Sequence, residues 1–158
     1  MTPTITAGRV AIIVGNLAYS IGAFIADYSE THVFNERWPP NVRSSHAACL
    51  AKPNIDKARF HNGQTMSLGV LLATTSLFYL FKPARDHKEA KDNLLTSALV
   101  GSFYCVAAMT AILYPGTAWQ DPEFHQGGEQ RFVFSGICVL MLVGYLLESR
   151  RLAKTKSS

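Results

Sequence analysis

The sequence lacks the short motifs that bind nucleotides or flavins, attach haem or carry a reactive serine. It has no Gly-x-Gly-x-x-Gly fingerprint, no Walker loop and no nucleophile elbow. Cysteine is also scarce: Cys105 and Cys138 lie inside apolar runs and Cys49 lies in a polar stretch, so no disulfide framework is expected. These absences argue against nucleotide, flavin and acyl-serine chemistry, and we expect no cofactor.

Charge is absent from four apolar blocks, which contain no Asp, Glu, Lys or Arg: Val10–Ala26, Thr65–Phe81, Leu94–Leu113 and Phe132–Leu147. Each block approaches the roughly 20 residues that a helix needs to cross a hydrocarbon layer. A soluble bundle would need a charged stripe along each helix, and these blocks have none. The sequence therefore predicts an all-α bundle of four transmembrane helices, as a single integral membrane domain over residues 1–158, with the lipid bilayer as partner.

Lysine and arginine are unevenly divided between the connecting segments. Nine lie in the N-terminal segment, the middle connection and the C-terminal tail, and six lie in the first and third connections. Because cytosolic segments carry the excess of basic residues, we expect both termini in the cytosol. The net charge of +4 follows from these clusters, which attract anionic lipid, and we expect no nucleic-acid partner.

The segment Val42–Lys57 interrupts the first connection. It reads "VRSSHAACLAKPNIDK" and has neither helical nor strand periodicity. Long connections of this kind are usually functional or disordered. A retained intron is a different explanation, because the codons of this segment can spell a splice donor site at its start, a branch point at Pro53 and a splice acceptor site at its end. This hypothesis predicts that transcripts lacking these codons dominate, which RNA sequencing across the junction would test.

Two stretches, "AGRVAIIVGNLAYSIGAFIADYSETHVFNERWPP" and "ARFHNGQTMSLGVLL", resemble an uncharacterised family of small fungal four-helix integral membrane proteins. The Trp-Pro-Pro and Phe-His-Asn-Gly-Gln elements stand close together in that family, and Val42–Lys57 departs from its pattern. In size and helix count the chain is also distantly similar to DoxX-like proteins and to the small membrane anthrone oxygenases of fungal polyketide pathways. That second similarity is architectural and is weak evidence for function.

Polar residues gather at the predicted lumenal boundary of the membrane. The first helix ends there with Asp27, and the second begins there with His61 and Gln64. Spacings of three or four residues define one face on each helix. The first face holds Asn16, Tyr19 or Ser20, Ala23 and Asp27, and the second holds His61, Gln64, Ser67 or Leu68, and Leu71. A polar group facing lipid costs on the order of several kcal/mol. We therefore expect both faces to point into the bundle.

An acid–base site is the chemistry that these residue types favour. The imidazole of His61, with an ordinary pKa of about 6.5, can take and return a proton, and the Asp27 carboxylate would stabilise its charged form. Gln64 lines the same pocket, and His32 or His125 approaches from the connecting segments. The residues predicted to bind a lipophilic substrate are Asn16, Tyr19, Arg37, Trp38, Arg59 and Asn62.

Two other interpretations stay open. Asn16 can bond across a helix interface, and Asp27 and His61 can be wetted at the membrane boundary without a chemical role. A metal site would take its ligands from separate segments: His32, His61, His125 and one of Asp27, Asp121 or Glu123. The sequence has no His-x-x-x-His or Cys-x-x-Cys pair, so we expect no metal.

Together these features predict a small membrane enzyme or accessory factor acting on a lipophilic metabolite, such as a terpenoid or polyketide intermediate. The reaction would be acid–base isomerisation, cyclisation or cofactor-free oxygenation, with the substrate entering from lipid. The alternative is a non-catalytic structural, scaffolding or transport-assisting protein, with a second copy or pathway enzymes as partners. Lys154 and Lys156 resemble a lysine-based retrieval signal and predict the endoplasmic reticulum, whereas a simple basic tail would bind anionic lipid.

Overall fold

The computed structural model describes residues 2–28, 55–115, 117–119 and 129–156. Within these ranges the chain forms four long α helices and no strand. The helices are α1 (Ala7–Asp27), α2 (Ile55–Phe81), α3 (His87–Thr110) and α4 (Gln130–Lys156), with a short 3-10 helix, η1 (Ala111–Leu113), after α3. All four are long and apolar enough to cross a membrane. The predicted all-α fold is confirmed in these ranges, and it indicates an integral membrane protein.

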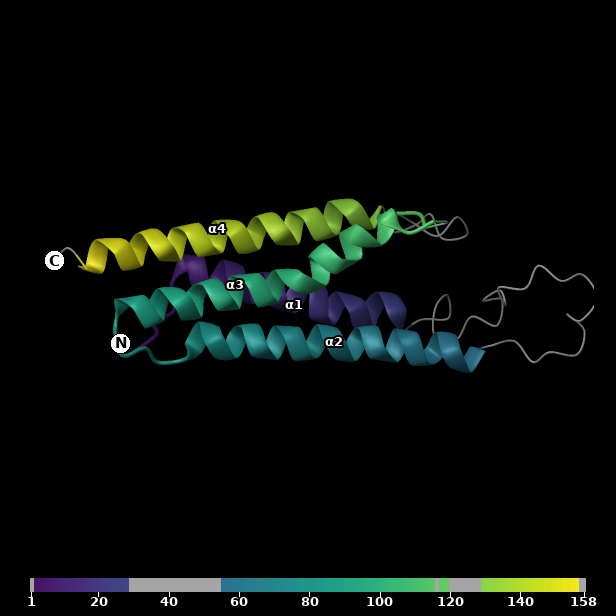
Figure 1. Cartoon of the computed structure of the whole chain (residues 1–158), viewed down its shortest axis with the longest axis horizontal. Helices are drawn as coiled ribbons and strands as arrows, with labels where there is room; N and C mark the ends of the chain where they lie inside the picture. Colours follow the sequence, from purple (N-terminus) through teal and green to yellow (C-terminus); the bar gives the residue numbers. More distant parts are fainter. Residues whose placement is uncertain (1, 29–54, 116, 120–128, 157–158) are drawn as a thin grey trace, which may run out of the picture.

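The four helices run alternately up and down (Figure 1). Helix α1 packs against α2 and α4, α3 packs against the same two helices, and α1 and α3 touch across the diagonal. The beginning of α1, the connection 82–86 and the end of α4 lie together, and we call this the basic end. The end of α1 and the beginnings of α2 and α4 form the far end (Figure 1).

The helices extend beyond the four apolar blocks because polar residues complete their hydrogen bonding. The Thr6 hydroxyl caps α1 by accepting from the Arg9 N–H at 3.3 Å. The Asp86 carboxylate caps α3 by accepting from the Glu89 N–H at 2.8 Å. That hydrogen bond lowers the pKa of Asp86 below its usual value. Of the segment Val42–Lys57, only the last three residues are described, and they begin α2.

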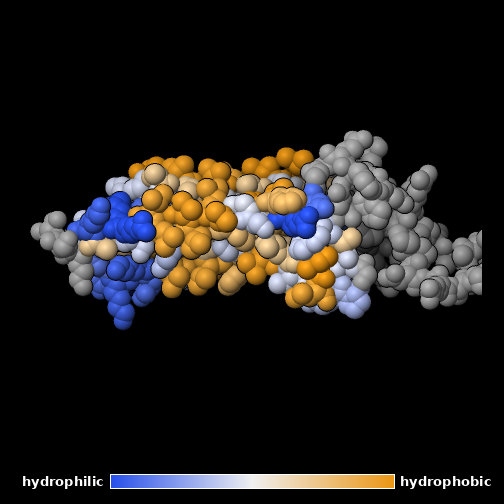
Figure 2. Space-filling model, turned by 90° about the horizontal axis from the view of Figure 1, so that it is seen from above, coloured by the Kyte–Doolittle hydropathy of each residue, from blue (hydrophilic) through white to orange (hydrophobic). Residues whose placement is uncertain are grey.

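The outer surface of the bundle is apolar over its middle (Figure 2). Leu71 is 64% exposed and Phe78 is 62% exposed on α2, and Phe103 on α3 and Leu142 on α4 are both more than half exposed. A soluble monomer rarely leaves so much contiguous apolar surface in water. The hydrophilic atoms of the basic end border this apolar band (Figure 2), as expected for a protein surrounded by lipid.

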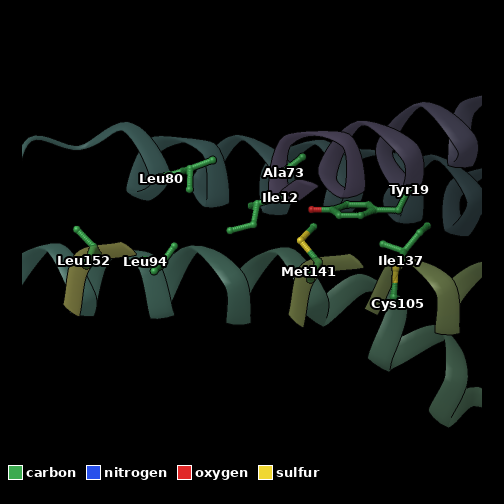
Figure 3. Packing of buried hydrophobic residues seen from close by; sticks show 9 residues of the cluster. All are labelled: Ile12, Tyr19, Ala73, Leu80, Leu94, Cys105, Ile137, Met141 and Leu152. Atoms are coloured by element: carbon green, nitrogen blue, oxygen red, sulfur yellow. The ribbon is translucent and has the colours of Figure 1, made fainter. Parts of the chain in front are cut away.

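All four helices contribute side chains to the core between them (Figure 3). The buried apolar residues are Ile12, Tyr19, Ala73, Leu80, Leu94, Cys105, Ile137, Met141 and Leu152. Helices α1 and α4 approach each other closely at Gly8 and Gly144, where a Cβ atom on Gly144 would lie 2.7 Å from the Gly8 carbonyl oxygen. Such small residues allow helix backbones to approach closely in a membrane.

Candidate functional site

The far end of the bundle is where the predicted acid–base residues of α1 and α2 meet. Asp27 is the last residue of α1, and His61 and Gln64 lie in the first turns of α2. Because these helix ends lie at the same end of the bundle (Figure 1), the fold brings the three backbone positions to one side of the protein. The side chains of Asp27 and Arg59 lie outside the described part of the structure.

The prediction that the His61 and Gln64 face of α2 points into the bundle is wrong. Both side chains are exposed, and Leu71, two turns further on the same face, is 64% exposed. The His61 ring packs edge-on against Phe60, with 5.8 Å between ring centroids. Asn62 is half-buried, and its Nδ2 atom has no hydrogen-bond partner among the described residues.

Helix α2 buries a different face, made mainly of small side chains. Its buried residues repeat every three or four positions: Met66, Gly69, Ala73, Ser76 and Leu80. Small residues permit a closer approach to α1 and α3, and that packing contributes more to helix association in lipid than the polarity of a terminal turn. Polar residues such as His61 lie on the outer face near the start of the apolar part of the helix, outside its densely packed middle.

The remaining predicted residues of this site lie outside the described residues. They are His32, His125, Arg37 and Trp38. The prediction that one of these histidines joins Asp27 and His61 in a single pocket therefore stays a prediction. The same holds for the metal alternative. The described residues include no group of three His, Cys, Asp or Glu side chains suited to a metal ion, and four of the residues proposed as ligands, His32, Asp121, Glu123 and His125, lie in undescribed segments.

Asn16 and Tyr19 lie in the middle of the bundle, where they form a buried polar network. The Asn16 amide Nδ2 donates to the Ile12 carbonyl and to the Ser76 hydroxyl, both at 2.9 Å. Its Oδ1 accepts from the Tyr19 hydroxyl at 2.9 Å. Asn16 is fully buried and Tyr19 is 2% exposed. The Asn16 side chain, which was predicted to contact substrate, thus uses both its amide nitrogen and its amide oxygen in hydrogen bonds to protein.

The Ser76 hydroxyl extends this network from α1 to α3. It donates to the Ser97 carbonyl at 2.8 Å and lies 3.2 Å from the Ser97 hydroxyl. Sequence reasoning missed both serines, although each interrupts a run of apolar residues. Because an unsatisfied polar group in hydrocarbon is costly, the network favours one register of α1, α2 and α3. Its arrangement is that of interhelical packing, as one of the open interpretations of Asn16 predicted.

A second polar cluster occupies the basic end, centred on the Glu148 carboxylate of α4. Glu148 is 1% exposed. Its Oε2 accepts from the Thr6 hydroxyl at 2.6 Å, and its Oε1 accepts from Arg9 Nε at 3.1 Å and from Arg151 Nη2 at 2.7 Å. The sequence did not reveal this pairing, because Glu148 directly follows the last apolar block and looked like the start of a solvated tail.

A cavity of about 30 Å³ lies beside this cluster. Its polar and charged lining residues are Thr2, Arg9, Tyr79, Lys82, Asn93 and Arg151, and Leu80, Leu94 and Leu152 are among its apolar ones. Arg9 Nη1 and Asn93 Nδ2 are buried donors without a hydrogen-bond partner in the described structure. Buried donors are normally satisfied by protein or by a bound molecule, and the two residues that leave these donors unpaired both line this cavity.

Comparison with known protein families gives a match. The model of a family of unknown function, DUF6640, matches residues 43–157. No curated protein and no solved structure matches the chain. The matched range includes most of Val42–Lys57, and the retained-intron hypothesis stays a prediction. Since the family model covers most of the sequence, including the whole of α2, α3 and α4, the chain belongs to the DUF6640 family.

Proposed function

We propose that this protein is a non-catalytic accessory protein of the membrane, which supports enzymes acting on a lipophilic metabolite. One observation carries the proposal: the polar face of α2 with His61 and Gln64 is exposed on the outside of the bundle. Side chains in this position are accessible to a partner at the membrane boundary. Phe60 beside them is 68% exposed, and an exposed aromatic residue among polar ones is typical of protein contact surfaces.

The buried network supports the same proposal. Catalysis in the interior would need a polar group that is free to bind substrate, and the Asn16 side chain already bonds to Ile12, Ser76 and Tyr19. The network therefore serves to hold the helices together. An apolar exterior keeps the bundle in the bilayer, where lipophilic metabolites and the enzymes that act on them also reside.

Acid–base catalysis at the far end is the second candidate function. It is favoured by the meeting of the Asp27 position with His61 and Gln64 at one end of the bundle. In this case the His61 imidazole would take a proton from the substrate and return it, and residues of the first or third connection would close the pocket around the substrate. Isomerisation, cyclisation and cofactor-free oxygenation of a terpenoid or polyketide intermediate remain the proposed reactions.

Metabolite profiling separates the two candidates. A strain lacking the gene is complemented with the wild type, with His61→Ala, or with Ser67→Ala as a control for an exposed polar residue on the same helix, and protein abundance is measured by immunoblot. Catalysis predicts that His61→Ala accumulates the same unconverted intermediate as the empty strain, at normal abundance. The accessory function predicts that His61→Ala forms product at a reduced rate, because the contact surface loses one of several residues, and accumulation of that intermediate to the level of the empty strain would overturn it.

We further propose that both termini are cytosolic and that the protein resides in the endoplasmic reticulum. The basic end unites the start of α1, the connection 82–86 and the end of α4, so the basic clusters lie on one side, in accord with the charge rule. Substitution of Lys154 and Lys156 by serine should release a tagged protein to later secretory compartments. If the double variant still co-localises with reticulum markers, the tail is not the retrieval signal.

A further inference from the structure

The cavity at the basic end combines two unpartnered donors with a positively charged lining. Arg9 and Asn93 are buried, at 9% and 7% exposure, and Arg9 Nη1 and Asn93 Nδ2 lack partners in the described structure. Three of the lining residues, Arg9, Lys82 and Arg151, are cationic and none is acidic. Donors and positive charge in one place are the features that bind an oxyanion.

Neighbouring carboxylates neutralise this charge only in part. Glu148 accepts from both Arg9 and Arg151, so one carboxylate faces two guanidinium groups. Lys82 Nζ lies 3.5 Å from a Glu89 oxygen, and the Lys82 side chain is 38% exposed. One positive charge is therefore left in the cluster, and Arg9 Nη1 has no hydrogen-bond partner in the described structure.

The size and the apolar lining of the cavity restrict the ligand. A volume of about 30 Å³ holds two or so oxygen atoms, given that one water needs on the order of 10–15 Å³ by this measure. It therefore has room for one or two oxygens of a phosphate, and the rest of the ligand lies outside the cavity. Leu80, Leu94 and Leu152 lie beside the donors, at the ends of membrane-spanning helices, where the phosphate and the glycerol carbons of a lipid meet.

From this combination we propose that the cavity binds the phosphate oxygens of a lipid with a small anionic headgroup. Arg9 Nη1 and Asn93 Nδ2 donate to the phosphate, Lys82 and Arg151 supply charge at its rim, and the leucines contact the apolar part of the lipid. The ligand satisfies two buried donors that protein leaves open. It also bridges α1, α2, α3 and α4, since each helix or its adjoining connection contributes to the lining.

The test uses the purified full-length protein in detergent and native mass spectrometry with phosphatidic acid or phosphatidylcholine of matched acyl chains. Asn93→Asp replaces the donor by a charged acceptor, and Lys82→Gln removes a lining charge. Lys91→Gln is the matched control, because it also lowers the net charge by one at the same end but does not line the cavity. Loss of a hydrogen bond to a charged group predicts about tenfold or more weaker binding of phosphatidic acid by Asn93→Asp than by Lys91→Gln.

The outcomes distinguish a site from surface attraction. Stronger binding of phosphatidic acid than of phosphatidylcholine, with specific loss in Asn93→Asp and Lys82→Gln, supports the proposal. Equal effects in all three variants, or equal binding of both lipids, overturn it. Inorganic phosphate that displaces the lipid at comparable concentration assigns the site to free phosphate and overturns the lipid as ligand. Circular dichroism checks that each variant is folded. If Asn93→Asp is unfolded, the comparison of phosphatidic acid binding by Lys82→Gln and by Lys91→Gln decides.

Discussion

The close contact between Gly8 and Gly144 predicts that replacing glycine by alanine destabilises the protein at Gly144 and does not destabilise it at Gly22. In Gly144→Ala the new Cβ would lie 2.7 Å from the Gly8 carbonyl oxygen and 2.8 Å from Cγ1 of Ile12. Ordinary contacts of a Cβ atom begin at 3.4 Å. Because the oxygen belongs to backbone, it cannot rotate away, and α1 and α4 must separate. In Gly22→Ala the new Cβ would meet nothing within 4 Å.

The difference between these two variants isolates the steric cost. Both replace a glycine inside a helix by alanine, so the gain in helix propensity, about 1 kcal/mol, is similar in each and cancels in the comparison. Overpacking a tight contact costs about 1–3 kcal/mol. We therefore expect the free energy of unfolding of Gly144→Ala to be about 1–3 kcal/mol below that of Gly22→Ala, with Gly22→Ala at or above the wild type.

Unfolding by sodium dodecyl sulfate in mixed micelles, followed by circular dichroism, measures these free energies at one lipid and detergent composition. Comparison within one detergent system is essential, because absolute stabilities in micelles depend on the micelle. A Gly144→Ala variant as stable as Gly22→Ala would refute the close approach of α1 and α4. A loss in both variants would instead show that the α1 glycine has a contact that the described residues do not contain.

Three further predictions concern polar groups. Asn16→Ala leaves the Tyr19 hydroxyl without its acceptor and should lower the free energy of unfolding by about 1–2 kcal/mol, and no change in the same detergent titration would contradict a packing role. Glu148→Gln leaves the Arg9 guanidinium buried without a counter-charge and should cost about 3 kcal/mol, measured as a loss of abundance and of thermal stability. Since the pKa of Asp86 is lowered, by the hydrogen bond from the Glu89 N–H, its cap is complete above its usual pKa of 3.8 and is lost as pH falls further. Below that pH, the rate of amide exchange in the first turn of α3 should be higher in the wild type than in Asp86→Asn. Parallel pH dependences of this rate in the two proteins would refute the role of the Asp86 carboxylate as a cap.

The number and type of helices could be predicted from the sequence because charge is missing from four long runs. A run such as Val10–Ala26 has one stable solution in lipid, a helix whose backbone groups bond to one another. The helix ends could not be predicted in the same way. Thr6, Asp86 and Glu148 are polar residues that continue or cap a helix, and hydropathy alone does not separate such residues from a loop.

The interior of the site could be predicted only in part. The three- and four-residue spacing placed Asn16 and Tyr19 on a common inward face, and both are buried. The same reasoning failed for His61 and Gln64, since it weighed polarity alone and α2 instead buries its small residues. The pairing of Glu148 with Arg9 could not be predicted from any local pattern, because 139 positions separate the two residues.

That separation sets an order of assembly for the membrane bundle. At 5–20 residues per second, the ribosome makes Glu148 roughly 7 to 28 s after Arg9. During this interval α1 is already beside the bilayer, and its Arg9 guanidinium has to be hydrated, held by the translocation machinery or covered by a lipid phosphate. The Arg9 guanidinium gains its carboxylate partner only when α4 joins the bundle. A nascent chain that stops before α4 therefore carries an uncompensated cation at the membrane boundary, a mark by which quality control can distinguish it from the finished protein.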